Sequence, residues 1–74
     1  MMAMIEKLEN LKGRFWTNRQ ELIEEIEQLG FWLEEDETDY ITVYTDEEDY
    51  DQTEWVINLV VAGNTVAVDS IEEI

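Results

Sequence analysis

Carboxylate side chains are the groups of this chain that could do chemistry, and one stretch concentrates them. Residues 34–55, EEDETDYITVYTDEEDYDQTEW, hold eleven Asp and Glu residues and no Lys, Arg or His. Two carboxyl groups with pKa values set apart by their surroundings can act as acid and base in glycoside hydrolysis. That reaction needs a walled cleft, and this chain of 74 residues also has neither His nor Cys to act as base or nucleophile. We therefore predict that the protein is not an enzyme.

Carboxylates also bind cations, and one segment partly matches a calcium-binding loop. Asp49, Asp51 and Thr53 stand at alternate positions, as at the start of an EF-hand loop. However, Glu54 stands where that loop requires Gly, and Val60 stands where it requires a bidentate Glu. The absence of Cys also excludes thiolate sites for zinc or iron–sulfur clusters. We predict no specific metal site and no cofactor.

The charge distribution favours binding to a basic partner. All four Lys and Arg residues lie within the first 19 positions, where the net charge is +4 − 2 = +2, and the other 55 residues carry 18 acids and no base, or −18. The resulting net charge of −16 repels nucleic acid and anionic membranes and attracts basic surfaces. We expect a basic protein surface as the partner, without direct contact with nucleic acid or membrane.

Some of these acids are placed where they oppose folding. Glu24, Glu25 and Glu27 fall in the second half of an expected helix, where the helix dipole prefers cations, and Glu21 and Glu25 form a like-charge pair one turn apart. Solubility needs a net charge of magnitude only about 2 to 8. We infer that the excess charge is retained for a partner.

The predicted partner-binding residues come from two acidic segments on either side of an expected strand. Their loops either meet or, if they lie at opposite ends of the strand, form a stripe along one edge. Tyr50 lies between acids in the second segment, and we leave it and Tyr44 open between packing and partner contact, whereas we expect Trp32 to pack. The predicted residues are Glu34, Glu35, Asp36, Glu37, Asp46, Glu47, Glu48, Asp49, Tyr50 and Asp51.

In size and in charge over the whole chain, the protein resembles the small acidic DNA-mimic proteins of phages and plasmids. Those proteins inhibit restriction, CRISPR or other DNA-processing enzymes, so the resemblance implies a DNA mimic that occupies the basic nucleic-acid groove of a host protein. The resemblance involves no motif and assigns no role to any residue. The alternative is an acidic accessory or interaction domain, as a monomer or a homodimer, that binds a basic protein other than a nucleic-acid enzyme. Adaptation to a high-salt cytoplasm is a third explanation of the acidic excess.

The elements that would position these acids follow from the hydrophobic pattern. Apolar residues at helical spacing predict a helix over residues 3–12, ended by Gly13. A second helix is predicted to begin at Thr17 or Asn18, because Asn18 and Glu21 have the spacing of a capping box, and to end at Gly30.

From Phe31 onward the pattern alternates with a period of two, as in half-buried strands. EEDETD, residues 34–39, is expected to be the turn after the first strand. Gly63 and Asn64 predict a two-residue hairpin loop that pairs Ala62 with Thr65 and extends to Asn58 opposite Asp69. We expect the segment SIEEI, residues 70–74, to be a frayed tail or a single helical turn.

These elements predict an α+β domain of two layers, with one or two N-terminal helices packed on a four-stranded antiparallel β-meander. We expect a single domain over residues 1–74, with a helical part at about 3–29 and the meander at about 31–70. The second face of the sheet is apolar enough that either a dimer or the N-terminal helix is expected to cover part of it. No secretion signal or membrane span is apparent, so the expected location is the cytoplasm.

Overall fold

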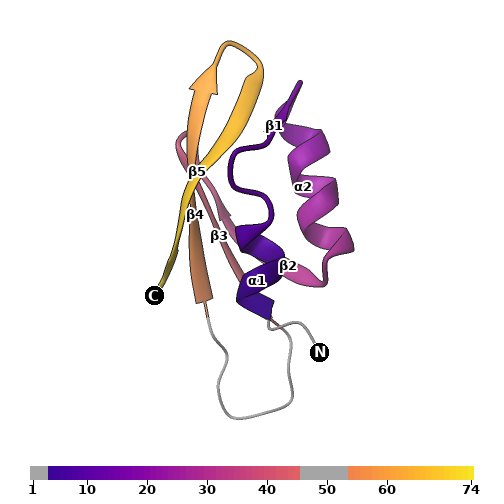
Figure 1. Cartoon of the computed structure of the whole chain (residues 1–74), viewed down its shortest axis with the longest axis vertical. Coiled ribbons are helices and arrows are strands. Elements are labelled where there is room, and N and C mark those ends of the chain that lie inside the picture. Colours follow the sequence, from indigo (N-terminus) through magenta and orange to yellow (C-terminus); the bar gives the residue numbers. More distant parts are fainter. Residues whose placement is uncertain (1–3, 46–53) are drawn as a thin grey trace.

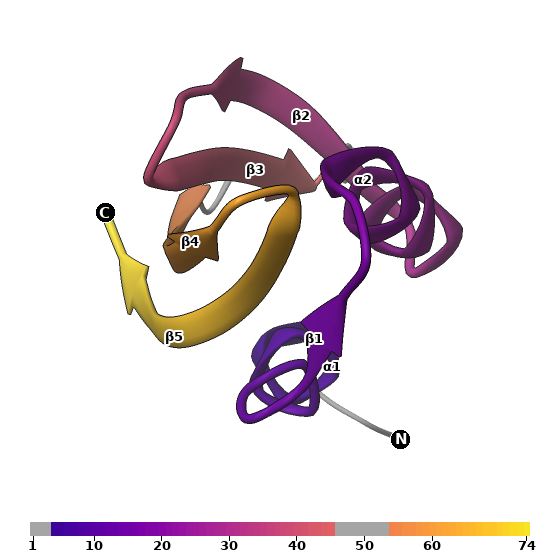
Figure 2. The ribbon, with the colours of Figure 1, turned by 90° about the horizontal axis from the view of Figure 1, so that it is seen from above.

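The computed structural model describes residues 4–45 and 54–74 and has two layers. Helices α1 (Met4–Glu9) and α2 (Arg19–Gln28) both lie on one side of a five-stranded antiparallel sheet (Figure 1; Figure 2). The α+β class is therefore confirmed, with one strand more than predicted. The strands are β1 (Phe15–Trp16), β2 (Phe31–Asp36), β3 (Tyr40–Thr45), β4 (Glu54–Ala62) and β5 (Thr65–Glu73).

Helix α2 begins and ends where its local signals predict. The backbone N–H of Glu21 donates to Asn18 Oδ1 at 3.0 Å, so Asn18 satisfies one of the free amides at the helix N-terminus. The helix turns cease at Gly30, whose φ of 100° is strained for any residue with a side chain. The helix is thus anchored at both ends by local chemistry.

The strand order is β1-β5-β4-β3-β2, so the last four strands are neighbours in chain order. The fifth strand, β1, was not predicted from the sequence. It pairs only Phe15 with Ala67 and Trp16 with Val66, along the outer edge of β5. Two residues are too few to show a period of two, so the sequence pattern does not indicate this strand. It is defined only by its pairing with β5.

The β4–β5 hairpin confirms most of the predicted register. Ala62 pairs with Thr65 across the Gly63–Asn64 turn, where Gly63 has a φ of 64°. A β-bulge then leaves Asp69 without a partner, so that Asn58 pairs with Ser70 and the predicted pairing of Asn58 with Asp69 is wrong.

The same bulge explains why the expected C-terminal tail is a strand. The one-residue shift pairs Ile71 with Ile57, and β5 continues to Glu73. In the sequence, Val68 and Ile71 are three residues apart, a spacing that does not indicate a strand without the bulge. The expectation of a frayed tail or helical turn is therefore wrong.

A single apolar core lies between the helices and the inner face of the sheet. Leu8 and Leu11 join it from α1 and the turn that follows, and Leu22 and Ile26 join it from α2. Trp55 on β4 is only 6% exposed and packs edge to face with Phe31, with ring centroids 5.5 Å apart. Helix α1 thus packs on the inner face, and in the described part of the chain no helix covers the outer face.

Candidate functional site

A β-bulge in β2 turns two successive glutamates to the outer face of the sheet. Leu33 pairs with Val43 and Glu35 pairs with Thr42, so Glu34 is the additional residue. The backbone N–H of Glu35 donates to Thr42 Oγ1 at 2.9 Å. Strict alternation would have placed Glu35 on the same side as Phe31 and Leu33, toward the core. The bulge therefore keeps both carboxylates in solvent, and it shows that the predicted turn at residues 34–39 is in part strand.

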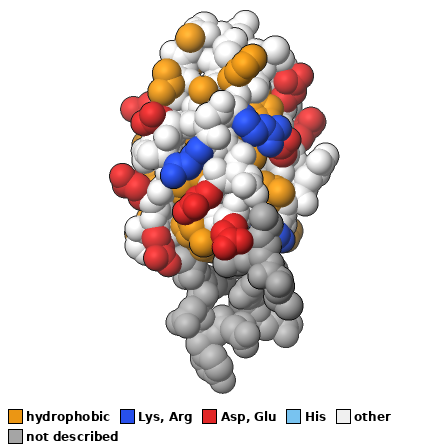
Figure 3. All heavy atoms as spheres, viewed as in Figure 1, with side chains coloured by type: hydrophobic (Ala, Val, Ile, Leu, Met, Phe, Trp, Pro, Cys, Tyr) orange, Lys and Arg blue, Asp and Glu red, His pale blue; other side chains and the backbone are white. Residues whose placement is uncertain are grey.

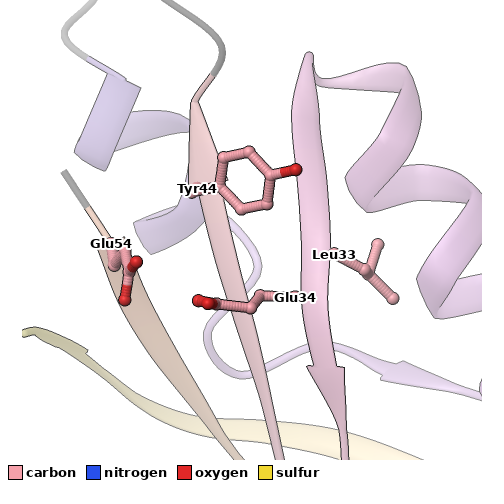
Figure 4. A pocket seen from close by; sticks show the side chains of 4 residues that line it. All are labelled: Leu33, Glu34, Tyr44 and Glu54. Atoms are coloured by element: carbon pink, nitrogen blue, oxygen red, sulfur yellow. The ribbon is translucent and has the colours of Figure 1, made fainter. Parts of the chain in front are cut away.

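Across β3, Glu34 faces an acid from β4. Figure 4 shows the carboxyl groups of Glu34 and Glu54 pointing toward each other over β3, beside the ring of Tyr44, whereas Leu33 points to the side of α2. These residues line an open hollow of about 440 Å³. Tyr44 pairs with both Trp32 and Glu54, so an aromatic row leads up to the two carboxylates.

The proximity of these like charges changes the acidity of Glu34. The negative charge of Glu54 is the main cause that raises the pKa of Glu34 above its ordinary value of 4.5. Partial loss of hydration, a hydrogen bond with Glu54 and the charge of Glu35 act in the same direction. Nearby, Tyr40 Oη donates to Glu35 Oε2 at 3.1 Å, and this bond raises the pKa of Tyr40. The fold thus holds carboxylates together against their mutual repulsion.

Substitution of Glu34 by Gln should stabilise the protein at neutral pH. Because the folded-state pKa is raised, the folded chain binds more protons than the unfolded chain between pH 4.5 and the folded pKa. Protonation of Glu34 therefore increases the free energy of unfolding. This contribution is fully present below pH 4.5 and is lost as the pH rises through the folded-state pKa. Glu34→Gln should raise the melting temperature at about pH 7 and leave it nearly unchanged at about pH 4, by thermal unfolding. Glu6→Gln, an equal charge change on α1, should not reproduce this dependence on pH, and an equal gain at both pH values would contradict the repulsion.

Two other predicted acids, Asp36 and Glu37, lie away from this pair. Asp36 pairs with Ile41, on the side of the sheet that faces the helices. There the guanidinium of Arg19 binds it, with Nη2 2.5 Å from Asp36 Oδ1, and also donates to the carbonyl oxygens of Glu37, Thr38 and Tyr40. Asp36 therefore has a structural partner that the sequence did not indicate, because Arg19 lies 17 residues before it.

The two predicted acidic segments border opposite ends of β3. In the antiparallel pair β2–β3, Phe31 pairs with Thr45 and Asp36 pairs with Ile41. The first acidic segment, which ends at Glu37, therefore lies beside the start of β3. Thr45 and Glu54, the described residues beside the second segment, lie at the other end. The second segment itself lies outside the described residues: Asp46, Glu47, Glu48, Asp49, Tyr50 and Asp51.

The basic residues all belong to the helical layer or its connections. Arg14 Nη1 lies 2.9 Å from Glu25 Oε2, without the alignment of a hydrogen bond, while Arg14 Nη2 donates to Oε1 at 3.0 Å. The guanidinium carbon also lies 5.0 Å from the ring centroid of Trp16. Glu25, expected to oppose folding, is thus compensated by Arg14. Strands β2 to β5 contain no base.

Acids are not confined to the sheet, since Figure 3 shows them over several parts of the surface. Among residues 4–45 and 54–74, only Glu25 and Asp36 have a basic side chain within salt-bridge distance, so the acids of the outer sheet face have none. What distinguishes this face is that two of its carboxyl groups, those of Glu34 and Glu54, point toward each other. Sequence reasoning missed Glu54 and Glu72 there, because Glu54 was considered only as part of a failed calcium loop and Glu72 was assigned to the tail. Trp32 is 54% exposed, so the expectation that it packs is wrong. We name the exposed acidic surface of β2, β4 and β5 the outer acidic face, and its members are Glu34, Glu35, Glu54 and Glu72.

Within the described ranges, no group of three or more acidic, His or Cys side chains gathers closely enough to hold a metal ion. None of the helices in that part of the chain is long and apolar enough to cross a membrane. Comparison with known proteins gives no match to any family model, to any curated protein or to any solved structure.

Proposed function

We propose that this chain is a non-enzymatic acidic binding protein whose outer acidic face binds a basic protein surface. The observation that carries the proposal is that the carboxyl groups of Glu34 and Glu54 point toward each other on a sheet face where the described residues include no base, and this proximity raises the pKa of Glu34. Holding these carboxylates together costs folding free energy, and a Lys or Arg side chain of a partner would relieve that repulsion. The exposed ring of Trp32 and the half-buried ring of Tyr44 add apolar contact area with polar edges, as is common at protein interfaces.

The partner that fits best is a protein groove that normally holds nucleic acid. The four acids lie on three of four neighbouring strands, β2 to β5, whose spacing of about 4.8 Å gives a width of roughly 14 Å. One strand of duplex DNA carries a phosphate per about 3.4 Å of axis, or about four over the same length. The outer acidic face thus offers a density of negative charge similar to that of one DNA strand. Association with such a groove would be fast and would weaken with salt.

The alternative is an accessory domain that binds a basic protein other than a nucleic-acid enzyme. The same acids and aromatic rings serve that function, and the two proposals differ only in the competitor. Duplex DNA should displace a DNA mimic from its target, whereas it should not displace an accessory domain.

A pair of charge-matched variants tests which face binds. One variant replaces the outer acidic face, with Glu34, Glu35, Glu54 and Glu72 changed to Gln, and the control changes Glu6, Glu9, Glu24 and Glu27 to Gln. Both lose four negative charges, so a difference in binding reports position rather than net charge. Immobilised wild-type protein and both variants are incubated with lysate at low salt, and retained proteins are identified by mass spectrometry. We expect the wild type and control to retain the same basic protein and duplex DNA to release it.

The expected loss for the outer-face variant is at least tenfold in affinity for the retained protein, measured by titration after its identification. Equal losses in the two variants would contradict the proposed face and leave only a nonspecific charge effect. Retention that duplex DNA does not compete would contradict the DNA mimic and support the accessory domain.

A further inference from the structure

A small hollow lies at the edge of the sheet and involves none of the four acids of the outer acidic face. Strand β2 is the last strand of the sheet, and the connection from the end of α2 leads directly into it (Figure 1). There a hollow of about 210 Å³ is lined by Glu27, Gly30, Phe31 and Trp32. We name it the edge hollow. Sites for drug-sized ligands begin at about 300 Å³, and one water takes about 30 Å³, so the edge hollow has room for a group of a few heavy atoms.

Three features of the edge hollow attract a cation. It lies at the C-terminus of α2, the negative end of the helix dipole, and α2 has no basic residue in its last turn. The exposed Glu27 adds a full negative charge there. Trp32 is 54% exposed, and the face of a Trp ring attracts cations. Within residues 4–45 and 54–74, no Lys or Arg lies at salt-bridge distance from Glu27.

The same helix shows which cation such an arrangement holds. Glu25, two residues before Glu27, binds the guanidinium of Arg14, whose Nη2 donates to Oε1 at 3.0 Å. The guanidinium carbon lies 5.0 Å from the ring centroid of Trp16 on β1. A guanidinium is thus held by a Glu of α2 and a Trp of an edge strand. The edge hollow repeats this pair of side chains with Glu27 on α2 and Trp32 on β2, the strand at the opposite edge.

We propose that the edge hollow binds the guanidinium group of a small molecule, which stacks on the ring of Trp32 and donates to the carboxylate of Glu27. A guanidinium is planar and weakly hydrated, and it gives two parallel hydrogen bonds to one carboxylate. An ammonium group is compact and strongly hydrated, so it gains less from a flat ring. A calcium ion needs about six or more oxygen ligands, and the described residues include no group of three acids that could hold a metal ion.

This site is independent of the binding of a basic protein by the outer acidic face. The charge control for that face already includes Glu27→Gln, and it is expected to keep the basic partner. Trp32 stands between the two surfaces, so Glu27 is the residue that distinguishes them. Loss of guanidinium binding would leave the proposed function standing, and failure to retain a basic protein would leave the edge hollow standing.

Nuclear magnetic resonance of the three Trp indole N–H groups tests the proposal directly. The probe is N-acetyl-L-argininamide, and N-acetyl-L-lysinamide is the comparison with the same charge, both at constant ionic strength. The Trp32 signal, assigned by its loss in Trp32→Phe, should shift with a dissociation constant of about 1 to 10 mM for the arginine compound. The lysine compound should bind roughly fivefold more weakly. Trp16 and Trp55 are 7% and 6% exposed, so their signals should not shift.

A pair of variants on one helix separates the edge hollow from general attraction to the acidic chain. Glu27→Gln should weaken binding of the arginine compound roughly fivefold or more, because the carboxylate that accepts its hydrogen bonds is lost. Glu24→Gln makes the same charge change at another exposed position of α2 that does not line the hollow, and it should change the dissociation constant less than about twofold. Both residues are exposed, so unchanged amide spectra should confirm that both variants fold.

Four results would overturn the proposal. A Trp32 signal that does not shift at about 50 mM of the arginine compound would exclude the site. Equal affinities for the arginine and lysine compounds would leave only attraction to the net charge of −16, and so would equal losses in Glu27→Gln and Glu24→Gln. Weaker capture of the basic partner by Glu27→Gln alone would place an arginine side chain of that protein in the hollow and contradict a small molecule as the source.

Discussion

Substitution of Trp55 by Ala is expected to leave most of the protein unfolded. Trp55 is 6% exposed, stands on β4 between β3 and β5, and packs edge to face against Phe31 in the apolar core. Loss of a buried Trp costs about 3 to 5 kcal/mol, and a domain of this size has a free energy of unfolding of only about 5 kcal/mol. Urea denaturation followed by far-ultraviolet circular dichroism should show the loss of the folded baseline.

Trp32→Ala is the matched control, because it removes the same type of side chain from β2, on the far side of β3, where it is 54% exposed. It should cost about 1 kcal/mol or less in stability. Under the proposed function it should still weaken binding of the partner, since Trp32 lies in the aromatic row beside Glu54. Similar losses of stability in the two variants would contradict the placement of Trp55 in the core and Trp32 on the surface.

The second large effect is expected for Arg19→Met. The Arg19 guanidinium binds the Asp36 carboxylate and three backbone carbonyls around the β2–β3 turn, and its side chain is only 27% exposed. Hydrogen bonds from a charged donor contribute roughly 1.5 to 3 kcal/mol in total at such a site, and the carbonyls lose their partner when the guanidinium is removed. We expect the free energy of unfolding to fall by about 2 kcal/mol in urea titrations.

Two controls separate the effect of these Arg19 hydrogen bonds from a general effect of charge. Lys12→Met makes the same change in net charge at an exposed position and should cost much less. Asp36→Asn removes the exposed ion pair but leaves the backbone carbonyls bonded, so it should cost less than about 1 kcal/mol. If Asp36→Asn proved as costly as Arg19→Met, the ion pair rather than the turn carbonyls would be the main stabilising contact.

The two arginine–carboxylate ion pairs reduce the number of acids that are free to bind a partner. Asp36 and Glu25 have arginine partners, so their charges contribute to the fold rather than remaining available for a partner. The acids of the outer acidic face have none among the described residues, and the carboxyl group of Glu54 points toward that of Glu34 and raises its pKa. The proposed binding function thus depends on a smaller set of acids than the total charge implies.

Local signals in the sequence determined several features of this protein. The Asn18 cap, the end of α2 at Gly30 and the hairpin turn at Gly63 were predictable, because each depends on one residue's hydrogen bonds or backbone freedom. The α+β class was also predictable, since the helical and alternating patterns occupy separate parts of the chain. The net charge of −16 and its concentration after residue 19 are properties of the sequence alone.

Tertiary structure decided the positions of the acids relative to one another. The bulge at Glu34 depends on pairing with β3, and the bulge at Asp69 depends on pairing with β4. Strand β1 exists only through pairing with β5, and Arg19 meets Asp36 only because α2 packs beside the end of β2. The sequence of one strand does not specify its register with the neighbouring strand. Alternation alone would therefore have put Glu35 toward the core and left Ile71 in a tail. Which carboxylates are paired and which face solvent together was therefore settled by contacts between residues far apart in the chain.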